Sequence, residues 1–152
     1  MTLLLAFLIG LFAGLRSLTA PATVAWAVYM GWLKLDGPLA LIGSLPSVLI
    51  LTLLAVGELV ADKLPRTPNR TAPLGLVARL VTGAVTGACI TAAAGQGIFP
   101  GGLLGALGGL VGCFGGYHAR KRLVQALGVP DIYVALLEDL VAIAGCLWVA
   151  TR

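Results

Sequence analysis

The sequence predicts an all-α bundle of helices that cross a membrane several times. Of its 152 residues, 59% are hydrophobic and only 11% are charged, whereas soluble domains carry about 25% charged residues. Its 21 glycines suit helices whose backbones approach closely in lipid. The Lys and Arg residues gather at the ends of apolar stretches, so the net charge of +4 indicates membrane topology and no binding of nucleic acid.

Six apolar stretches follow one another without a polar linker long enough to separate domains, so a single transmembrane domain over residues 1–152 is expected. Crossing the hydrocarbon core takes about 20 helical residues, which the last stretch and the fourth provide. The first two are too short, and Pro21 lies between them. They can form one kinked span, a re-entrant hairpin or two thin spans, which leaves four to six membrane segments. The stretches are 2–15, 21–33, 45–61, 74–95, 101–117 and 132–150.

Basic residues are distributed unequally between the two sides that these stretches define. The predicted loops 63–73 and 118–130 share one side and hold most of them, while the other side holds Lys34 and Arg152. The positive-inside rule then places both loops in the cytoplasm, next to anionic lipids, and the C-terminus in the periplasm or outside the cell. The loop residues are Lys63, Arg66, Arg70, Arg120, Lys121 and Arg122.

Two short motifs recur in the two halves of the chain. Residues 10–13 (GLFA) resemble residues 75–78 (GLVA), and residues 58–61 (ELVA) resemble residues 138–142 (EDLVA) with one insertion. The half-repeats would be 1–63 and 74–152. Three segments in each half would give the halves opposite orientations in the membrane, as in many small transporters.

Four charged residues within apolar stretches are the candidate substrate-binding residues: Arg16, Glu58, Arg79 and Glu138. Each costs about 2.5–3.5 kcal/mol near the bilayer centre, so each is a functional hypothesis. The two arginines would neutralise the two glutamates and bind a small anionic or zwitterionic solute. The alternative is that charges at helix ends extend to the lipid headgroups. Secondary candidates are Asp62, Lys63, Asp139, Arg66 and Arg70.

Glycines recur at spacings of three and four in the fifth stretch, which places them on one face of a helix. Such a face predicts close helix packing, within the chain or in a homo-oligomer. The helix-packing residues would be Gly105, Gly108, Gly109, Gly112 and Gly116. The three cysteines, in contrast, stand singly in apolar stretches, so neither a disulfide framework nor a cysteine metal site is expected.

Residues 14–16 (GLR) with 19–21 (TAP), the run 58–72 with Arg79, and residues 134–139 (VALLED) together resemble a known family. It is the bacterial membrane-protein family of domain of unknown function 4126. The resemblance covers nearly the whole chain, implies a bacterial inner-membrane protein and supplies no activity. A local stretch, residues 58–67, is similar to a motif of undecaprenyl-diphosphate phosphatases, but has Asp62 for Glu and Lys63 for Phe.

The leading functional prediction is a small homo-oligomeric transporter or channel-like protein with no cofactor and no catalytic residue. The alternative is an enzyme or carrier for a polyprenyl or phospholipid phosphate headgroup. In that case Arg66 and Arg70 would bind phosphate. Carboxylates would hold Mg²⁺ or Ca²⁺, namely those of Glu58, Asp62, Glu138 and Asp139. A third prediction is a membrane assembly partner without a substrate.

Overall fold

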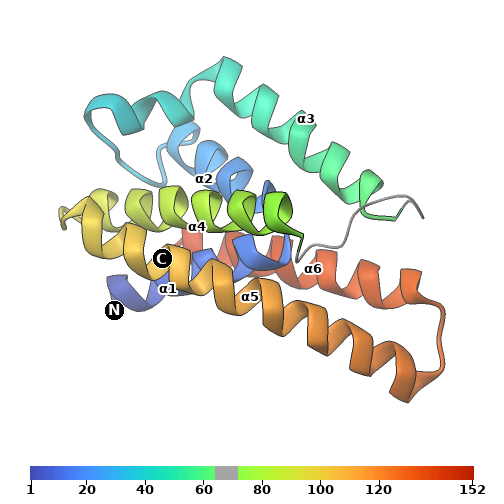
Figure 1. Cartoon of the computed structure of the whole chain (residues 1–152). Coiled ribbons are helices and arrows are strands. Elements are labelled where there is room, and N and C mark those ends of the chain that lie inside the picture. The colour runs from blue at the N-terminus through green and yellow to red at the C-terminus, as the bar shows by residue number, and fades with distance from the viewer. Residues whose placement is uncertain (64–71) are drawn as a thin grey trace.

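The computed structural model describes residues 1–63 and 72–152 and confirms a helical membrane bundle (Figure 1). Within these ranges every regular element is a helix, and η1 is a 3₁₀ helix. The order is α1 (Thr2–Leu15), α2 (Thr19–Tyr29), η1 (Gly37–Gly43), α3 (Leu45–Ala61), α4 (Pro73–Ala93), α5 (Ile98–Leu127) and α6 (Asp131–Ala150).

In the part of the chain that the structure describes, three helices are long and apolar enough to cross a membrane, namely α4, α5 and α6. The pair of η1 and α3, bent by 59°, gives a fourth span when taken together. With 14 residues, α1 is about 21 Å long at 1.5 Å per residue, which is shorter than the hydrocarbon core of about 30 Å. The first helix is therefore shorter than a typical membrane span.

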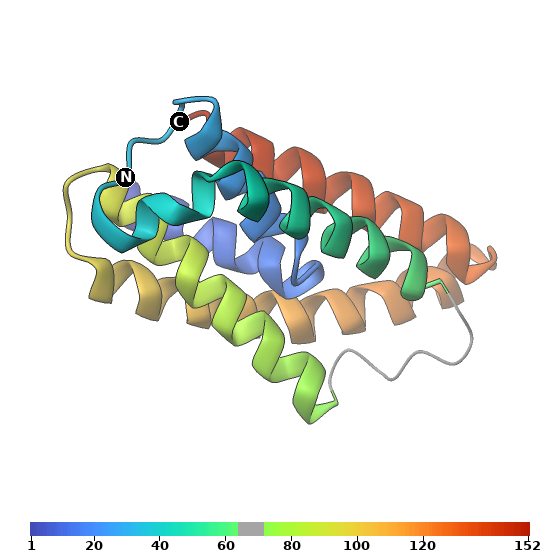
Figure 2. The same ribbon diagram turned by 90° about the horizontal axis from the view of Figure 1, so that it is seen from above.

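Helices α1 and α2 form a hairpin, so the structure excludes one kinked span and leaves the other two arrangements that the sequence permits, a re-entrant hairpin and two thin spans. The chain leaves α1 at Arg16, whose backbone is extended (φ −139°, ψ 109°), and α2 then runs back along α1 (Figures 1 and 2). The turn lies inside the bundle, because Arg16 is 0% exposed. Thr2, Lys34 and Arg152 line one cavity, so the N-terminus lies at the same end of the bundle as the C-terminus.

Both α1 and α4 pack on α5 through backbone contacts between glycines. A Cβ atom on Gly109 of α5 would lie 2.7 Å from the carbonyl oxygen of Arg79, and one on Gly14 would lie 2.6 Å from the backbone nitrogen of Cys113. Any side chain there would push the helices apart. Of the other predicted packing residues, Gly105, Gly108 and Gly112 are buried, whereas Gly116 lines a cavity between α5 and α6.

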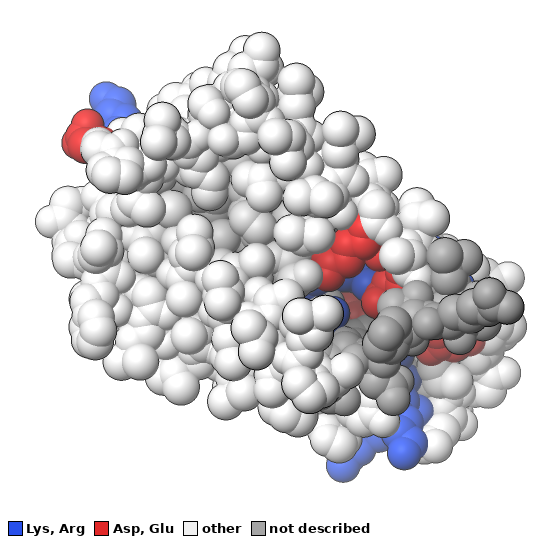
Figure 3. All heavy atoms as spheres, turned by 45° about the horizontal axis from the view of Figure 1, so that its top comes forward, with Lys and Arg blue, Asp and Glu red and all other residues white. Residues whose placement is uncertain are grey.

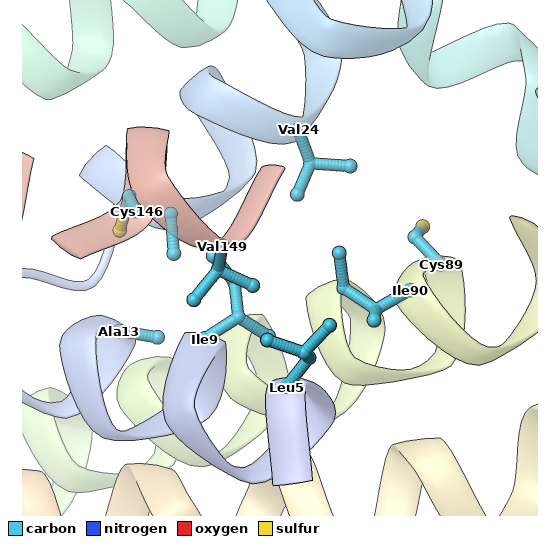
Figure 4. Close-up of a cluster of buried hydrophobic side chains, with 9 residues drawn as sticks. Leu5, Ile9, Ala13, Val24, Cys89, Ile90, Cys146 and Val149 are labelled. Carbon is cyan, nitrogen blue, oxygen red and sulfur yellow. The ribbon is translucent and has the colours of Figure 1, made fainter. Parts of the chain in front are cut away.

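An apolar cluster joins the hairpin to α4 and α6 (Figure 4). Ile9 and Val24 of the hairpin meet Ile90 of α4 and Val149 of α6, and the four side chains are at most 4% exposed. Residues between α2 and α3, such as Leu33 and Ile42, pack against the cluster. This core holds the hairpin at the end of the bundle that carries both termini.

Two predicted boundaries are wrong. Residues 118–127 are the last three turns of α5 and not part of a cytoplasmic loop, and α2 ends at Tyr29 and not at residue 33. The apolar pattern stops at Tyr117, but the run that follows is rich in Ala, Arg, Lys, Leu and Gln, which favour helix. The helix ends where Gly128 takes the left-handed conformation (φ +61°). The inverted repeat stays a prediction.

Candidate functional site

Charged side chains from the hairpin turn and from four helices meet in one region, which we term the ionic centre. Figure 3 shows acidic and basic atoms together in a hollow, while other charged atoms lie near the two ends of this face. Each member pairs with a residue of opposite charge from another part of the chain. The members are Arg16, Glu58, Asp62, Lys63, Arg79, Arg120, Glu138 and Asp139.

Arg16 occupies the middle of the ionic centre and is completely buried. Its Nη1 atom pairs with Asp62 at the end of α3, and its Nη2 atom lies 2.6 Å from Oδ1 of Asp139 in α6. Its Nε atom is buried and has no hydrogen-bond partner among the residues that the structure describes. One guanidinium thus joins the hairpin to two other helices, while its Nε donor is unused by the described residues.

Asp139 is shared between two cations. Besides Arg16, it accepts a hydrogen bond of 2.7 Å from Nζ of Lys63, which also donates to the carbonyl oxygen of Leu59 at 2.8 Å. The carboxylate is 9% exposed and the Lys63 side chain 24%. Lys63 therefore lies at the rim of the ionic centre and Asp139 inside it.

The carboxylate of Glu58 closes the N-terminal end of α2. Oε1 accepts hydrogen bonds from the backbone N–H of Ser17 (2.9 Å) and from its hydroxyl (2.7 Å), and Oε2 accepts one from the N–H of Leu18 (2.8 Å). The first N–H groups of a helix have no partner within it and favour a negative charge. Glu58 supplies both the acceptors and the charge.

Arg79 supplies hydrogen-bond donors at the C-terminal end of α1, as Glu58 supplies acceptors at the N-terminal end of α2. Its Nε donates to the carbonyl oxygen of Gly14 (3.0 Å), and its Nη1 donates to that of Gly75 (3.0 Å). Its Nη2 also lies 3.9 Å from Oε1 of Glu58. A chain that breaks its helix within lipid must find partners for the freed backbone groups. Glu58 and Arg79 provide them on the two sides of the turn.

Arg120 is also a member of the ionic centre, although the apolar pattern of the sequence predicts a loop at this position. It donates to Asp131 at the start of α6 (Nε–Oδ1 2.8 Å), and its Nη1 lies 3.5 Å from Asp62 and 3.6 Å from Glu138. In the sequence, the helix-favouring composition of residues 118–127 indicates that the helix continues through Arg120. It places Arg120 on the same helix as the glycine face, close to the polar ends of α3 and α6.

The structure brings the four principal candidates into one region and places one predicted arginine beside one predicted glutamate, while Arg16 and Glu138 have other partners. Glu58 and Arg79 are neighbours, whereas Glu138 lies beside Arg120. Arg16 contacts the two acids that were predicted to have secondary roles. Arg66 and Arg70 lie outside the described residues.

The carboxylates of the ionic centre pair with basic side chains: Asp62 and Asp139 share Arg16, and Asp62 and Glu138 share Arg120. Within residues 1–63 and 72–152, no three His, Cys, Asp or Glu side chains are placed to hold a metal ion together. The arrangement that the alternative prediction required, with Glu58, Asp62, Glu138 and Asp139 around a divalent cation, is not formed by these residues.

Comparison with known proteins identifies one match. A family model described as a domain of unknown function, number 4126, matches residues 3–151, which is almost the whole chain. No curated protein and no solved structure matches the chain. The local similarity of residues 58–67 to undecaprenyl-diphosphate phosphatases is not shown by any of these comparisons.

Proposed function

The chain belongs to the family of domain of unknown function 4126, and we propose that it is a small transporter whose ionic centre binds a zwitterionic or anionic solute. We place it in the inner membrane of a bacterium, with the Lys63 and Arg120 end of the bundle toward the cytoplasm. Basic residues at that end support this orientation.

The observation that carries the proposal is the position of Arg16. It is completely buried at the tip of the α1–α2 hairpin, between Asp62 and Asp139. A buried ion pair contributes little stability compared with apolar packing of the same size, and a charge within a membrane domain marks a site of function by default. Glu58 and Arg79 already satisfy the backbone of the turn, so packing does not account for Arg16.

Two helix ends meet at this site, where the chain is interrupted between α1 and α2. The binding sites of many transporters are formed in the same way, at the ends of interrupted helices. The C-terminus of α1 and the N-terminus of α2 flank Arg16. A solute with one positive and one negative group can exchange with the internal pairs without leaving a net buried charge. Its anionic group would take the place of Asp62 or Asp139 against Arg16, and its cationic group would pair with the carboxylate thus released.

The test is solute binding by the purified protein, followed by flux in proteoliposomes. We expect at least one of glycine, betaine, glutamate and inorganic phosphate to raise the melting temperature and to be taken up. Arg16→Gln should abolish both effects, while Lys34→Gln, at the other end of the bundle, should leave them unchanged. Equal uptake by the Arg16→Gln protein would overturn the proposal.

A further inference from the structure

A groove lies between α3 and α6, with α2 behind it. Both helices pack on α2 but not closely on one another. The space left between them has a volume of about 260 Å³. Its lining is mostly apolar, with Ala55, Val56 and Leu147 among the side chains. Such a lining suits a hydrocarbon chain.

The groove runs from Trp32 to residues that adjoin the ionic centre. At one end it is lined by Trp32, an aromatic residue of the kind that occurs where a membrane meets water. At the other end each wall adjoins a charged residue. Thr19 follows Arg16 by three residues, Leu59 follows Glu58 directly, and Ile143 lies one helical turn after Asp139.

A hydroxyl group without a partner marks the charged end of the groove. Thr19 is 5% exposed, and its Oγ1 atom has no hydrogen-bond partner among the described residues. The other two threonines of the groove are satisfied: Thr23 donates to the carbonyl oxygen of Thr19 (2.9 Å), and Thr52 donates to that of Val48 (2.7 Å). Buried polar groups are nearly always paired, so Thr19 indicates a ligand that accepts a hydrogen bond.

We propose that the substrate of the ionic centre is an amphiphile with one hydrocarbon chain and a zwitterionic headgroup, taken up sideways from the bilayer. The chain lies in the groove, and the headgroup reaches the ionic centre. There the hydroxyl of Thr19 and the unused Nε of Arg16 donate to its anionic group. This inference rests on the proposed function and narrows its substrate class, because a small water-soluble solute would leave the groove without a role.

The experiment uses lysophosphatidylcholine that carries a photoreactive group in its chain, with the whole protein in nanodiscs. Irradiation should label residues of α2, α3 and α6 that line the groove. Val56→Trp, which fills the groove from a half-exposed position, should reduce labelling about tenfold. Leu53→Trp is the matched control, because Leu53 lies on the same helix, is 72% exposed and does not line the groove.

Competition separates this inference from the proposed function. Unlabelled lysophosphatidylcholine should prevent labelling, whereas glycerophosphocholine, which has the headgroup without the chain, should not. Thr19→Val should weaken binding of lysophosphatidylcholine relative to an uncharged monoacylglycerol. If Val56→Trp leaves labelling unchanged, or if glycerophosphocholine competes equally well, the substrate is not an amphiphile held in the groove. The proposal that a small solute binds at Arg16 is unaffected by either result. Cross-linking of a cysteine at position 56 to a second copy would also overturn the amphiphile as the occupant of the groove.

Discussion

The carboxylate of Glu58 in α3 accepts two hydrogen bonds from Ser17, one from the backbone N–H at 2.9 Å and one from the hydroxyl at 2.7 Å. Ser17 lies in the turn of the α1–α2 hairpin, 41 residues away in sequence. Helix α3 otherwise packs on α2 and η1. The contact between Glu58 and Ser17 therefore fixes the hairpin turn against the C-terminal half of α3.

Replacing Glu58 by Gln should destabilise the protein by about 1.5–3 kcal/mol, because hydrogen bonds to a charged group are lost from a buried turn. Ser17→Ala removes one of these bonds and should cost about 1 kcal/mol. Unfolding in mixed micelles measures both changes. Asp36→Asn, at an exposed carboxylate in the connection between α2 and α3, should have no effect. A Glu58→Gln protein as stable as the original would show that the turn does not depend on this acid.

Removing one partner of the pair between Arg16 and Asp139 should cost about 3–5 kcal/mol, because the other charge remains buried. The double variant Arg16→Gln with Asp139→Asn should lose less than the sum of the two single losses, since neither charge is then stranded. A double-mutant cycle on unfolding free energies measures the difference. Additive losses would mean that the two side chains do not interact.

Gly109→Ala should destabilise the bundle by about 1–3 kcal/mol, because the new Cβ would lie 2.7 Å from the backbone oxygen of Arg79. Gly115 is the control on the same helix, since a Cβ there meets nothing within 4 Å. Gly115→Ala should be neutral or stabilise the helix by up to about 1 kcal/mol. Similar stabilities of the Gly109→Ala and Gly115→Ala proteins would show that the close approach of α4 and α5 at Gly109 does not stabilise the bundle.

Arg120→Gln should reduce stability by about 1–3 kcal/mol, because Asp62 and Glu138 lose a neighbouring cation inside the bundle. Lys121→Gln and Arg122→Gln alter exposed side chains of the same basic run and should change stability by less than about 0.5 kcal/mol. Melting temperatures of the three proteins give the comparison. Equal losses of stability in the three proteins would indicate that this basic run serves only to orient the chain in the membrane.

A reporter that is active only outside the cytoplasm should be active when fused to either terminus, because the hairpin brings the N-terminus to the end of the bundle that holds Arg152. Inserted after Gly128, between α5 and α6, it should be silent. Activity at one terminus only would contradict the hairpin. Activity after Gly128 alone would reverse the orientation that the basic residues predict.

The apolar stretches by themselves determined that the chain is a helical membrane bundle and where most helices lie. Hydrophobicity over about 20 residues is a local property, so α4 and α6 were predictable within two residues. The same applies to the unusual residues: Arg16, Glu58, Arg79 and Glu138 stand out because charge is costly in lipid. The resemblance of residues 58–72 and their neighbours to the family was also present in the sequence.

Only the tertiary structure decided which charges meet. The pairing of Arg16 with Asp139, and of Arg120 with Glu138, depends on how α5 and α6 are rotated about their axes. Glu138 and Asp139 point about 100° apart on their helix, so the rotation of α6 about its axis decides which of them faces Arg16. The hairpin was equally undecided, because a break at Arg16 permits a kink or a reversal. The reversal is favoured by distant contacts, namely Glu58 and Arg79 at the turn and the apolar cluster around Ile9 and Val24.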